Sequence, residues 1–272
     1  MKITSLVENS SAAGLPAEHG LSLHIRLEDG RQILFDMGQS SLFAENAERL
    51  GIQIADIDAA VISHGHYDHG GGLRRFLELN GKAKVYVNSH AFEPHYSLKA
   101  DGLKYIGLDP DLKDCGRIVL CENSFRIGND ILLFADVKGE YMMPEGNKTL
   151  FGPSADVNDK FRHEQSLMIH EGGKTVLFAG CSHCGILNII RESIQQAGVS
   201  PSHVFAGMHL AKSTLLPRQQ REFINMLADK LLEYRDCRYF TMHCTGIHQY
   251  EMLKEKMGSA ISYFSCADTV EL

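Results

Sequence analysis

Short apolar runs alternate with amphipathic segments along the chain, and this alternation predicts a mixed α/β fold. In the first half, strands are predicted at residues 2–7, 21–27, 32–36, 59–62 and 84–88, and helices at 40–50 and 73–79. In the second half, strands are predicted at 166–170, 175–179, 203–210, 239–243 and 260–266, and helices at 185–198, 215–234 and 248–257. The second half repeats the strand and helix order of the first, although no residue-level repeat is visible.

The stretch at about 92–160 does not follow this pattern. Its apolar runs are short, with clear strands predicted only at 118–120 and 131–134. Irregular segments on a regular scaffold are common places for ligand recognition. We therefore predict a single domain over residues 1–272, in which an irregular insertion at about 92–160 sets substrate specificity.

Charge and composition narrow the classes of partner. The 272 residues have a formal net charge of −7 at pH 7 and no cluster of Lys or Arg, so a nucleic acid is not expected as a partner. Glu8 and Asn9 interrupt the first apolar run before it could form a signal peptide, and no apolar stretch is long enough to span a bilayer. We expect a cytoplasmic protein that acts on a small molecule. The sequence leaves its oligomeric state open.

The cysteines do not indicate a disulfide framework, because there are seven of them without regular spacing. Most are expected to be small buried residues or loop thiols, namely Cys115, Cys121, Cys184, Cys237 and Cys266. Cys181 and Cys244 are adjacent or close to histidines, so they have to be considered together with the candidate metal ligands.

A cluster of candidate metal ligands follows a predicted buried strand. Residues 63–72 read SHGHYDHGGG, in which three histidines and one aspartate fall within six positions. In an extended segment, His64 and His66 point to the same side and can share one cation. Asp68 and His69 lie beyond a bend, where they can reach a second cation. The motif therefore predicts a loop that binds up to two metal ions.

This H-x-H-x-D-H loop resembles the hallmark motif of the metallo-β-lactamase superfamily. Two later stretches, GCSHCGI at residues 180–186 and HCTG at residues 243–246, look like the motifs of one branch, which contains the dihydropterin-methyl-ribofuranosylaminobenzene-phosphate synthases. The resemblance extends over nearly the whole chain and is weakest at about 92–160. It implies an αββα sandwich with the site at the sheet edges, and a phosphorylated substrate or a diphosphate leaving group.

Two further candidates follow from the resemblance. Asp36 ends an apolar strand and resembles the first motif of the superfamily, where a carboxylate orients a ligand histidine. Its alternatives are to bind metal or to cap the next turn. His19 lies in an E-H-G-L-S stretch similar to that of related sequences, so it is expected either to contact substrate or to be an exposed loop residue.

Three residues compete to complete the first metal site. Cys181 stands where most members of the superfamily have a bridging aspartate and some zinc β-lactamases have a cysteine ligand. His163 stands where the third histidine is usual, but without its small-residue context. We prefer His183, because imidazole and carboxylate ligands suit a two-cation hydrolytic site, whereas a bridging thiolate is prone to oxidation.

Two histidines at strand ends compete for the last ligand position. The superfamily pattern places this ligand on the final strand before the C-terminal helix, which favours His243. His209 is then expected to be a pocket residue that binds substrate or transfers protons, or else a hydrogen-bonded core histidine.

The resulting prediction is a hydrolase that uses a metal-activated water molecule on a phosphorylated small molecule. One divalent ion is predicted at His64, His66 and His183, and another at Asp68, His69 and His243. Zinc is preferred over manganese, iron or nickel. Asp68 is also the expected proton acceptor. The alternatives are a mononuclear iron thiol dioxygenase and a non-catalytic protein that binds its ligand with the help of a metal.

Overall fold

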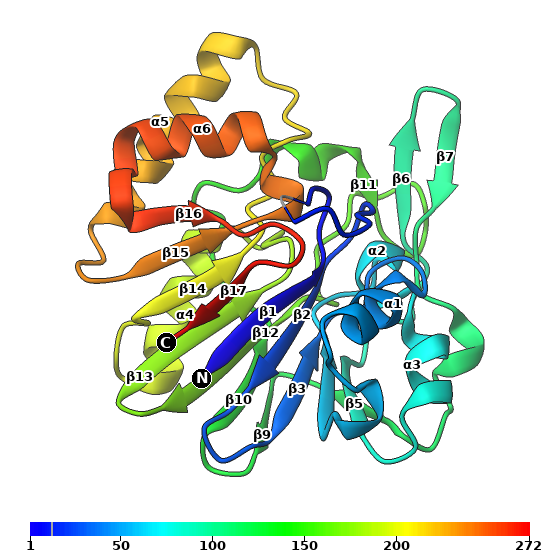
Figure 1. Cartoon of the computed structure of the whole chain (residues 1–272). Helices are drawn as coiled ribbons and strands as arrows, with labels where there is room; N and C mark the ends of the chain where they lie inside the picture. Colours follow the sequence, from blue (N-terminus) through cyan, green and yellow to red (C-terminus); the bar gives the residue numbers. More distant parts are fainter. Residues whose placement is uncertain (12) are drawn as a thin grey trace.

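The computed structural model describes residues 1–11 and 13–272, and its strands form two seven-stranded sheets stacked face to face (Figure 1). The first sheet has the order β17 (Thr269–Glu271), β1 (Lys2–Val7), β2 (Ser22–Arg26), β3 (Gln32–Phe35), β4 (Ala59–Ile62), β5 (Lys84–Asn88) and β8 (Ile118–Cys121). The second sheet has the order β16 (Ile261–Tyr263), β15 (Arg238–Thr241), β14 (His203–Ala206), β13 (Lys174–Ala179), β12 (Gln165–Glu171), β10 (Ile131–Ala135) and β9 (Ser124–Ile127).

Helices cover the outer face of each sheet. Those of the first half are α1 (Leu42–Arg49), the short α2 (Tyr67–Gly70) and α3 (Leu73–Leu79), and those of the second half are α4 (Ile186–Ala197), α5 (Pro217–Leu232) and α6 (Ile247–Met257). Short 3₁₀ helices are η1 (Ile54–Asp56), η2 (Pro110–Leu112), η3 (Glu145–Thr149), η4 (His243–Thr245) and η5 (Gly258–Ala260). The predicted αββα sandwich is confirmed. In the described part of the chain, no helix has the length and apolar character needed to cross a membrane.

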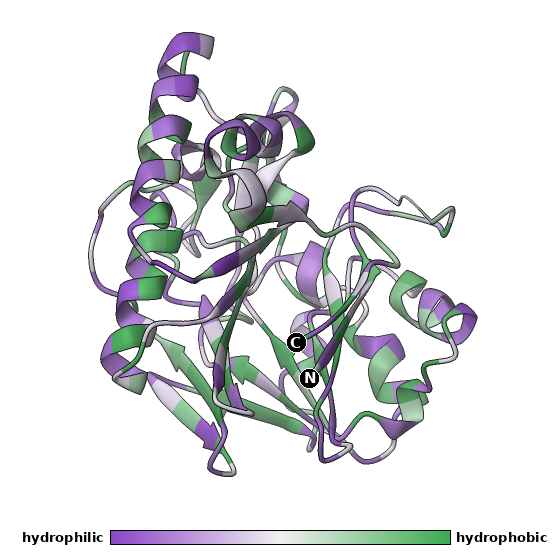
Figure 2. Cartoon of the chain, turned by 60° about the vertical axis from the view of Figure 1, so that its left-hand side comes forward, coloured by the Kyte–Doolittle hydropathy of each residue, from purple (hydrophilic) through white to green (hydrophobic). Residues whose placement is uncertain are grey.

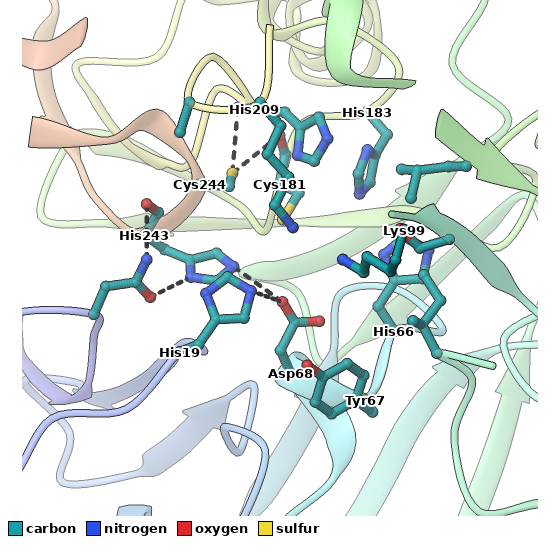
Figure 3. Close-up of a pocket in the computed structure, with 16 residues that line it drawn as sticks. His19, His66, Tyr67, Asp68, Lys99, Cys181, His183, His209, His243 and Cys244 are labelled. Atoms are coloured by element: carbon teal, nitrogen blue, oxygen red, sulfur yellow. Dashed lines mark hydrogen bonds and ion pairs between the residues drawn. The ribbon is translucent and has the colours of Figure 1, made fainter. Parts of the chain in front are cut away.

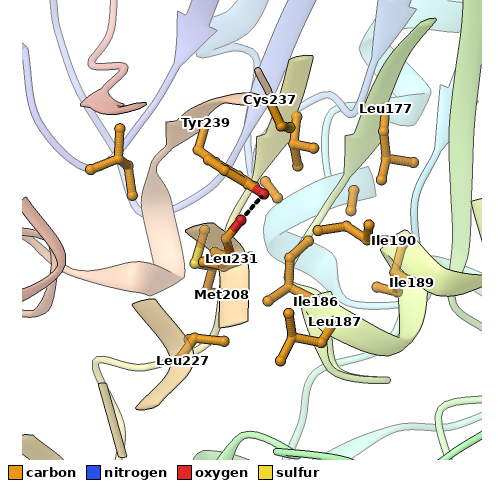
Figure 4. Packing of buried hydrophobic residues seen from close by; sticks show 14 of the residues in the cluster. Leu177, Ile186, Leu187, Ile189, Ile190, Met208, Leu227, Leu231, Cys237 and Tyr239 are labelled. Atoms are coloured by element: carbon orange, nitrogen blue, oxygen red, sulfur yellow. Dashed lines mark hydrogen bonds between the residues drawn. The ribbon is translucent and has the colours of Figure 1, made fainter. Parts of the chain in front are cut away.

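Apolar side chains hold the layers together, and Figure 2 shows hydrophobic strands between helices that are hydrophilic on their outer sides. Between the sheets, the rings of Phe35 and Phe178 lie 6.0 Å apart, and those of Phe178 and Phe205 lie 5.2 Å apart. On the inner sides of α4 and α5, Ile190 and Leu231 are fully buried. The hydroxyl of Tyr239 donates a hydrogen bond to the backbone carbonyl of Leu231 (Figure 4). Burial of large aromatic and aliphatic side chains is the main stabilising contribution to such a core.

The direction of the central strands determines where the candidate ligands lie. Strands β3 and β4 are parallel, as are β13, β14 and β15. Each of these strands is followed by a predicted site residue, namely Asp36, His64, Cys181, His209 and His243. Ligand sites in α/β sheets form beyond the carboxyl ends of parallel strands, because polar loop residues meet there. The two sheets bring these ends together at one edge of the sandwich.

The irregular stretch at about 92–160 contains more regular structure than its pattern indicated. Strands β8, β9 and β10 complete the two large sheets, so these residues belong to the framework. The remainder forms a small third sheet in the order β11 (Leu150–Phe151), β6 (Tyr96–Lys99) and β7 (Gly102–Tyr105). Figure 1 shows the β6–β7 hairpin projecting beside the site edge. Strand β17, which pairs with β1, was also not predicted.

Candidate metal centre

The loop after β4 turns its histidines toward one another in the interior. His64 is fully buried, and its Nε2 lies 3.0 Å from Nδ1 of His66. Two nitrogen ligands of one tetrahedral zinc ion are separated by about 3.3 Å, which is close to this value. The alternation of an extended segment thus places both imidazoles on one side, as the sequence predicts.

A buried carboxylate supports the same loop from β3. Oδ2 of Asp36 lies 2.6 Å from Nδ1 of His69, and its Oδ1 accepts a hydrogen bond from the backbone N–H of Ser63. The Ser63 hydroxyl donates to Asp36 Oδ2 and lies 2.9 Å from Nδ1 of His64. Because Nδ1 of His69 is engaged in this way, its Nε2 is left facing the cluster. This is the contact of a carboxylate that orients a ligand histidine.

His183 is held by three hydrogen bonds from two residues. Its backbone N–H donates to the buried carboxylate of Glu164. The side-chain nitrogen of Asn147, on η3, donates a hydrogen bond to the backbone carbonyl of His183. The side-chain oxygen of the same amide lies 2.9 Å from Nδ1 of the His183 ring. The Nε2 atom of His183 is buried and has no hydrogen-bond partner among the described residues. A lone pair directed into a cluster of imidazoles fits a metal ligand.

His243 has the same three supports, supplied by the end of β1. Its backbone N–H donates to the carboxylate of Glu8, which is fully buried. The side-chain nitrogen of Asn9 donates a hydrogen bond to the backbone carbonyl of His243. The side-chain oxygen of Asn9 lies 2.8 Å from Nδ1 of the His243 ring. Its Nε2 lies 3.2 Å from Nε2 of His69 and 3.4 Å from Oδ2 of Asp68.

Cys181 lies between these two groups of ligands. Its sulfur is 3.2 Å from Nε2 of His69. The possible ligand atoms of His64, His66 and His183 lie within 4.8 Å of one another. The Cys181 sulfur meets the same distance limit in three further groups of three residues, namely with His64 and His69, with His183 and His209, and with His243 and Cys244. The predicted first metal set is therefore brought together, and the alternative Cys181 is in reach of both sets.

Burial keeps several of the imidazoles uncharged. It lowers the pKa of His64, His66 and His183 well below the ordinary histidine value, and neighbouring histidines add to the effect for His64 and His183. Burial likewise raises the pKa of the Cys181 thiol. Neutral imidazoles present lone pairs, and donors of this kind together with a carboxylate fit divalent zinc, manganese, iron or nickel.

In His69 and Asp68, neighbouring groups favour the charged form and outweigh burial. Burial disfavours the charged form of His69, but the Asp36 carboxylate outweighs burial and raises the pKa of His69 to about 9. Burial alone would raise the pKa of Asp68, but hydrogen bonds from His19 and His243 hold it well below the ordinary aspartate value. Asp68 is therefore a carboxylate at neutral pH.

His163 lies next to the cluster with both ring nitrogens engaged. Its Nδ1 accepts a hydrogen bond from the backbone N–H of Gly65, and its Nε2 lies 3.2 Å from Oδ2 of Asp159. Asp159 also lies 3.0 Å from Nδ1 of His95, a buried histidine whose ring is 3.9 Å from that of His163. His163, His95, Asp159 and His66 thus form a further group whose possible ligand atoms lie within 4.8 Å of one another.

A cavity of about 450 Å³ opens onto the cluster (Figure 3). His19 lines it and lies 3.0 Å from Asp68 Oδ2, with its side chain partly exposed. His209 also lines it, 4.4 Å from the ring of His183, and neither of its ring nitrogens has a hydrogen-bond partner among the described residues. Two lysines that the sequence did not single out, Lys99 and Lys212, complete this wall.

Sequence reasoning missed the residues that support the two histidines, namely Glu8, Asn9, Asn147 and Glu164. One signal was available for two of them. Glu8 and Asn9 directly follow β1, which runs in the same direction as β3 because β2 is antiparallel to both. Polar residues at that position therefore reach the same edge as Asp36. Asn147 lies in the irregular stretch, where no pattern indicates its partner.

An αββα sandwich with a buried cluster of imidazoles and carboxylates at one edge defines a protein of the metallo-hydrolase fold. A model of the metallo-beta-lactamase superfamily matches residues 16–192, more than half of the sequence, and the chain belongs to this superfamily.

Relatives of similar length support the assignment to a particular branch. An uncharacterized protein of Methanocaldococcus jannaschii is 29% identical over 260 residues, covering 93% of this chain and 94% of its own. The 7,8-dihydropterin-6-methyl-4-(beta-D-ribofuranosyl)-aminobenzene-5'-phosphate synthase of the same organism is 27% identical over 277 residues, covering 94% and 91%. The resemblance stated from the motifs is confirmed.

Solved structures give the same result. The crystal structure of Tm1679, a metal-dependent hydrolase of the beta-lactamase superfamily, has a TM-score of 0.80 and 29% identity, covering 100% of this chain and 99% of its own. A diphosphatase from the PhnP family shares the fold, with a TM-score of 0.54 and 14% identity over 100% of this chain and 97% of its own.

Proposed function

We propose that this protein is a metal-dependent hydrolase in which an activated water molecule attacks a phosphorylated small molecule. The observation that carries the proposal is the convergence of uncharged imidazole nitrogens and the Asp68 carboxylate beside one open cavity. Perturbed titratable groups that line a cavity are typical of catalytic sites.

Two divalent ions fit the donor atoms. His64, His66 and His183 would hold one ion, and Asp68, His69 and His243 the other, with zinc preferred to manganese, iron or nickel. The short distances from His64 to His66 and from His69 to His243 support this division. Cys181 is the alternative ligand, within reach of both sets.

Bound divalent ions supply an activated water at neutral pH and offset negative charge on the attacked group. The residues of the chain supply the remaining steps. Asp68 is ionised and faces the cavity, so it can accept a proton from the attacking water. His209 lines the same cavity, and its ring nitrogens have no hydrogen-bond partner in the described part of the chain, so it can move a proton to or from the leaving group. His19 contacts Asp68 at the cavity wall and is positioned to touch substrate.

The proposal of a phosphorylated substrate is supported by sequence similarity to a named relative. The methanogen relative is named as the synthase of a 5'-phosphate, and both it and this chain are matched over more than nine tenths of their lengths. We propose a small-molecule substrate in the cytoplasm. The formal net charge of −7 argues against a nucleic acid.

The test combines metal analysis of freshly purified protein with a screen of phosphodiesters, phosphomonoesters and lactones. Up to two divalent ions per chain and turnover of a phosphate ester are expected. One iron per chain with oxygen uptake on a persulfide would instead indicate a thiol dioxygenase. Tight binding of a phosphorylated compound without turnover, in fully metal-loaded protein, would indicate a non-catalytic binding protein.

A further inference from the structure

Two lysines from separate parts of the fold meet at the wall of the cavity. Lys99 is the last residue of β6, and Lys212 lies between β14 and α5. Both line the cavity together with His66 and His183. Figure 3 shows the side chain of Lys99 extending toward the space over His66. An anion bound at the metal centre would therefore lie in the same cavity as two ammonium groups.

No ion pair among residues 1–11 and 13–272 involves either of these two lysines. Other lysines of the neighbouring segments form ion pairs, such as Lys104 with Asp101 and Lys148 with Glu145. For Lys99 and Lys212, no carboxylate among the described residues comes within 4.0 Å. Partial burial lowers the pKa of Lys99, the charge of Lys212 lowers it further, and Asp68 opposes this.

A repulsive pair of this kind is notable in an acidic chain. The formal net charge of −7 provides an excess of carboxylates, yet none in the described part of the chain lies within 4.0 Å of these lysine nitrogens. Two like charges at short range cost free energy unless an anion lies between them. The arrangement is thus complementary to a ligand with at least two negative charges.

We propose that Lys99 and Lys212 form an anion subsite that binds a terminal phosphate group of the substrate, apart from the bond attacked at the metal centre. This inference rests on the proposed function, because both sites are taken to hold one substrate. A phosphate monoester carries about −1.5 to −2 charges at neutral pH, which matches two ammonium groups, whereas a carboxylate carries only one negative charge. Lysine binds phosphate as a compact point charge.

The rest of the cavity is compatible with a substrate that has two functional ends. Its volume of about 450 Å³ is in the range of small-molecule sites. Ser97, a buried residue on the same strand as Lys99, also lines it and offers a hydroxyl. The substrate class is therefore a phosphate or diphosphate ester that carries a second, terminal phosphate.

Binding of inorganic phosphate tests the subsite without any assumption about turnover. Phosphate is titrated at low salt into the full-length, as-purified wild type, Lys99→Gln, Lys212→Gln and the control Lys104→Gln, with metal content measured for each protein. Lys104 is on the adjacent strand and pairs with Asp101. Loss of either cavity lysine should weaken binding about fivefold to tenfold, and the control should change it by less than about twofold. Equal phosphate affinity in all four proteins would overturn the subsite.

A second measurement separates this inference from the hydrolase proposal. Thymidylyl-thymidine and its 5'-phosphorylated form are compared as substrates. The lysine variants should raise KM only for the compound with the terminal phosphate and leave kcat within about twofold. Equal effects on both compounds would contradict the subsite even if hydrolysis is found. Lysine-dependent phosphate binding without any hydrolysis would refute the hydrolase and retain the subsite.

Discussion

The amide of Asn147 fixes the orientation of the His183 ring. Its nitrogen donates to the backbone carbonyl of His183, so its oxygen must be the atom that faces Nδ1 at 2.9 Å. Nδ1 therefore carries the proton, and Nε2 presents its lone pair to the cluster. The structure thus predetermines which nitrogen of His183 can bind metal.

Replacing this amide should weaken metal binding without unfolding the protein. In Asn147→Ala, the His183 ring loses its orienting contact, and metal affinity should fall about tenfold to hundredfold. Competition with a chromophoric chelator measures the affinity. Asn158→Ala is the matched control, because Asn158 bonds the carbonyls of Lys148 and Leu150 and touches no histidine. Equal losses in both variants would show that Asn147 only stabilises the loop.

His183 and Cys181 can be distinguished as ligands by direct comparison. If His183 binds metal, His183→Ala should lower metal occupancy and abolish turnover, because no other side chain replaces an imidazole ligand. Cys181→Ser should retain both ions and lose only packing or orientation. Metal content and activity are measured side by side at matched folding. The reverse ranking would assign the ligand role to Cys181.

The two proposed sets predict the stoichiometry of the variants. Wild-type protein should bind up to two transition-metal ions per chain. His64→Ala should empty mainly one site and Asp68→Ala mainly the other, because these residues belong to different sets. Elemental analysis of fully loaded protein gives the counts. A wild-type value that never exceeds one ion would exclude the dinuclear arrangement.

The pair of Asp36 and His69 predicts a pH-dependent stability of the metal-free protein. The folded-state pKa of His69, about 9, is above its ordinary value of 6.5, so the stabilisation is complete below pH 6.5 and is lost as pH rises through 9. The loss is at most about 3 kcal/mol. Urea unfolding of metal-free wild type between pH 6 and 9 should show this decline. In Asp36→Asn, the stability should be lower at pH 6 and should change less over the same range.

The lowered pKa of Lys99 predicts how phosphate binding varies with pH. The ammonium form binds phosphate, so affinity should begin to fall with rising pH below the ordinary lysine pKa of 10.5. Lys212→Gln removes one cause of the shift, and the pKa of Lys99 should then rise, although Asp68 still acts on it. Titration of the lysine side chains by NMR measures both effects. An unchanged Lys99 pKa in this variant would contradict an effect of the Lys212 charge on Lys99.

Much of the fold could be predicted because its signals are local. The alternation of apolar residues predicts most strands and helices, and the resemblance of the H-x-H-x-D-H loop to the superfamily motif implies the sandwich. Strand β17 was missed because it is three residues long and pairs with β1, at the other end of the chain. Strands β6 and β7 form a local hairpin, but their sequences, YSLK and GLKY, contain no apolar run that would indicate a strand. Residues 118–121 and 131–135 were placed in an insertion, yet they pair within the large sheets.

In the candidate site, too, residues with a local sequence signal could be predicted and contacts between distant residues could not. The histidines of residues 64–69 lie within one loop, so their spacing alone indicates shared ligands. The role of Asn147 could not be seen, because its contact with His183 spans 36 residues and depends on how η3 packs. The choice between His163 and His183 was open in the sequence for a similar reason. Only the fold shows that His163 is grouped with His95 and Asp159, and His183 with His64 and His66.

The contact between Glu8 and His243 has a consequence for the order of folding. It joins residues 235 positions apart, and closing a loop of that length costs about 5 kcal/mol of chain entropy. During synthesis, β1 emerges long before β17 and the segment that carries His243. Until β17 has emerged, the edge of β1 that will pair with β17 is free to pair with other nascent chains. We therefore expect the metal centre to be completed late, and chaperone dependence to remain until residues 269–271 of β17 have left the ribosome.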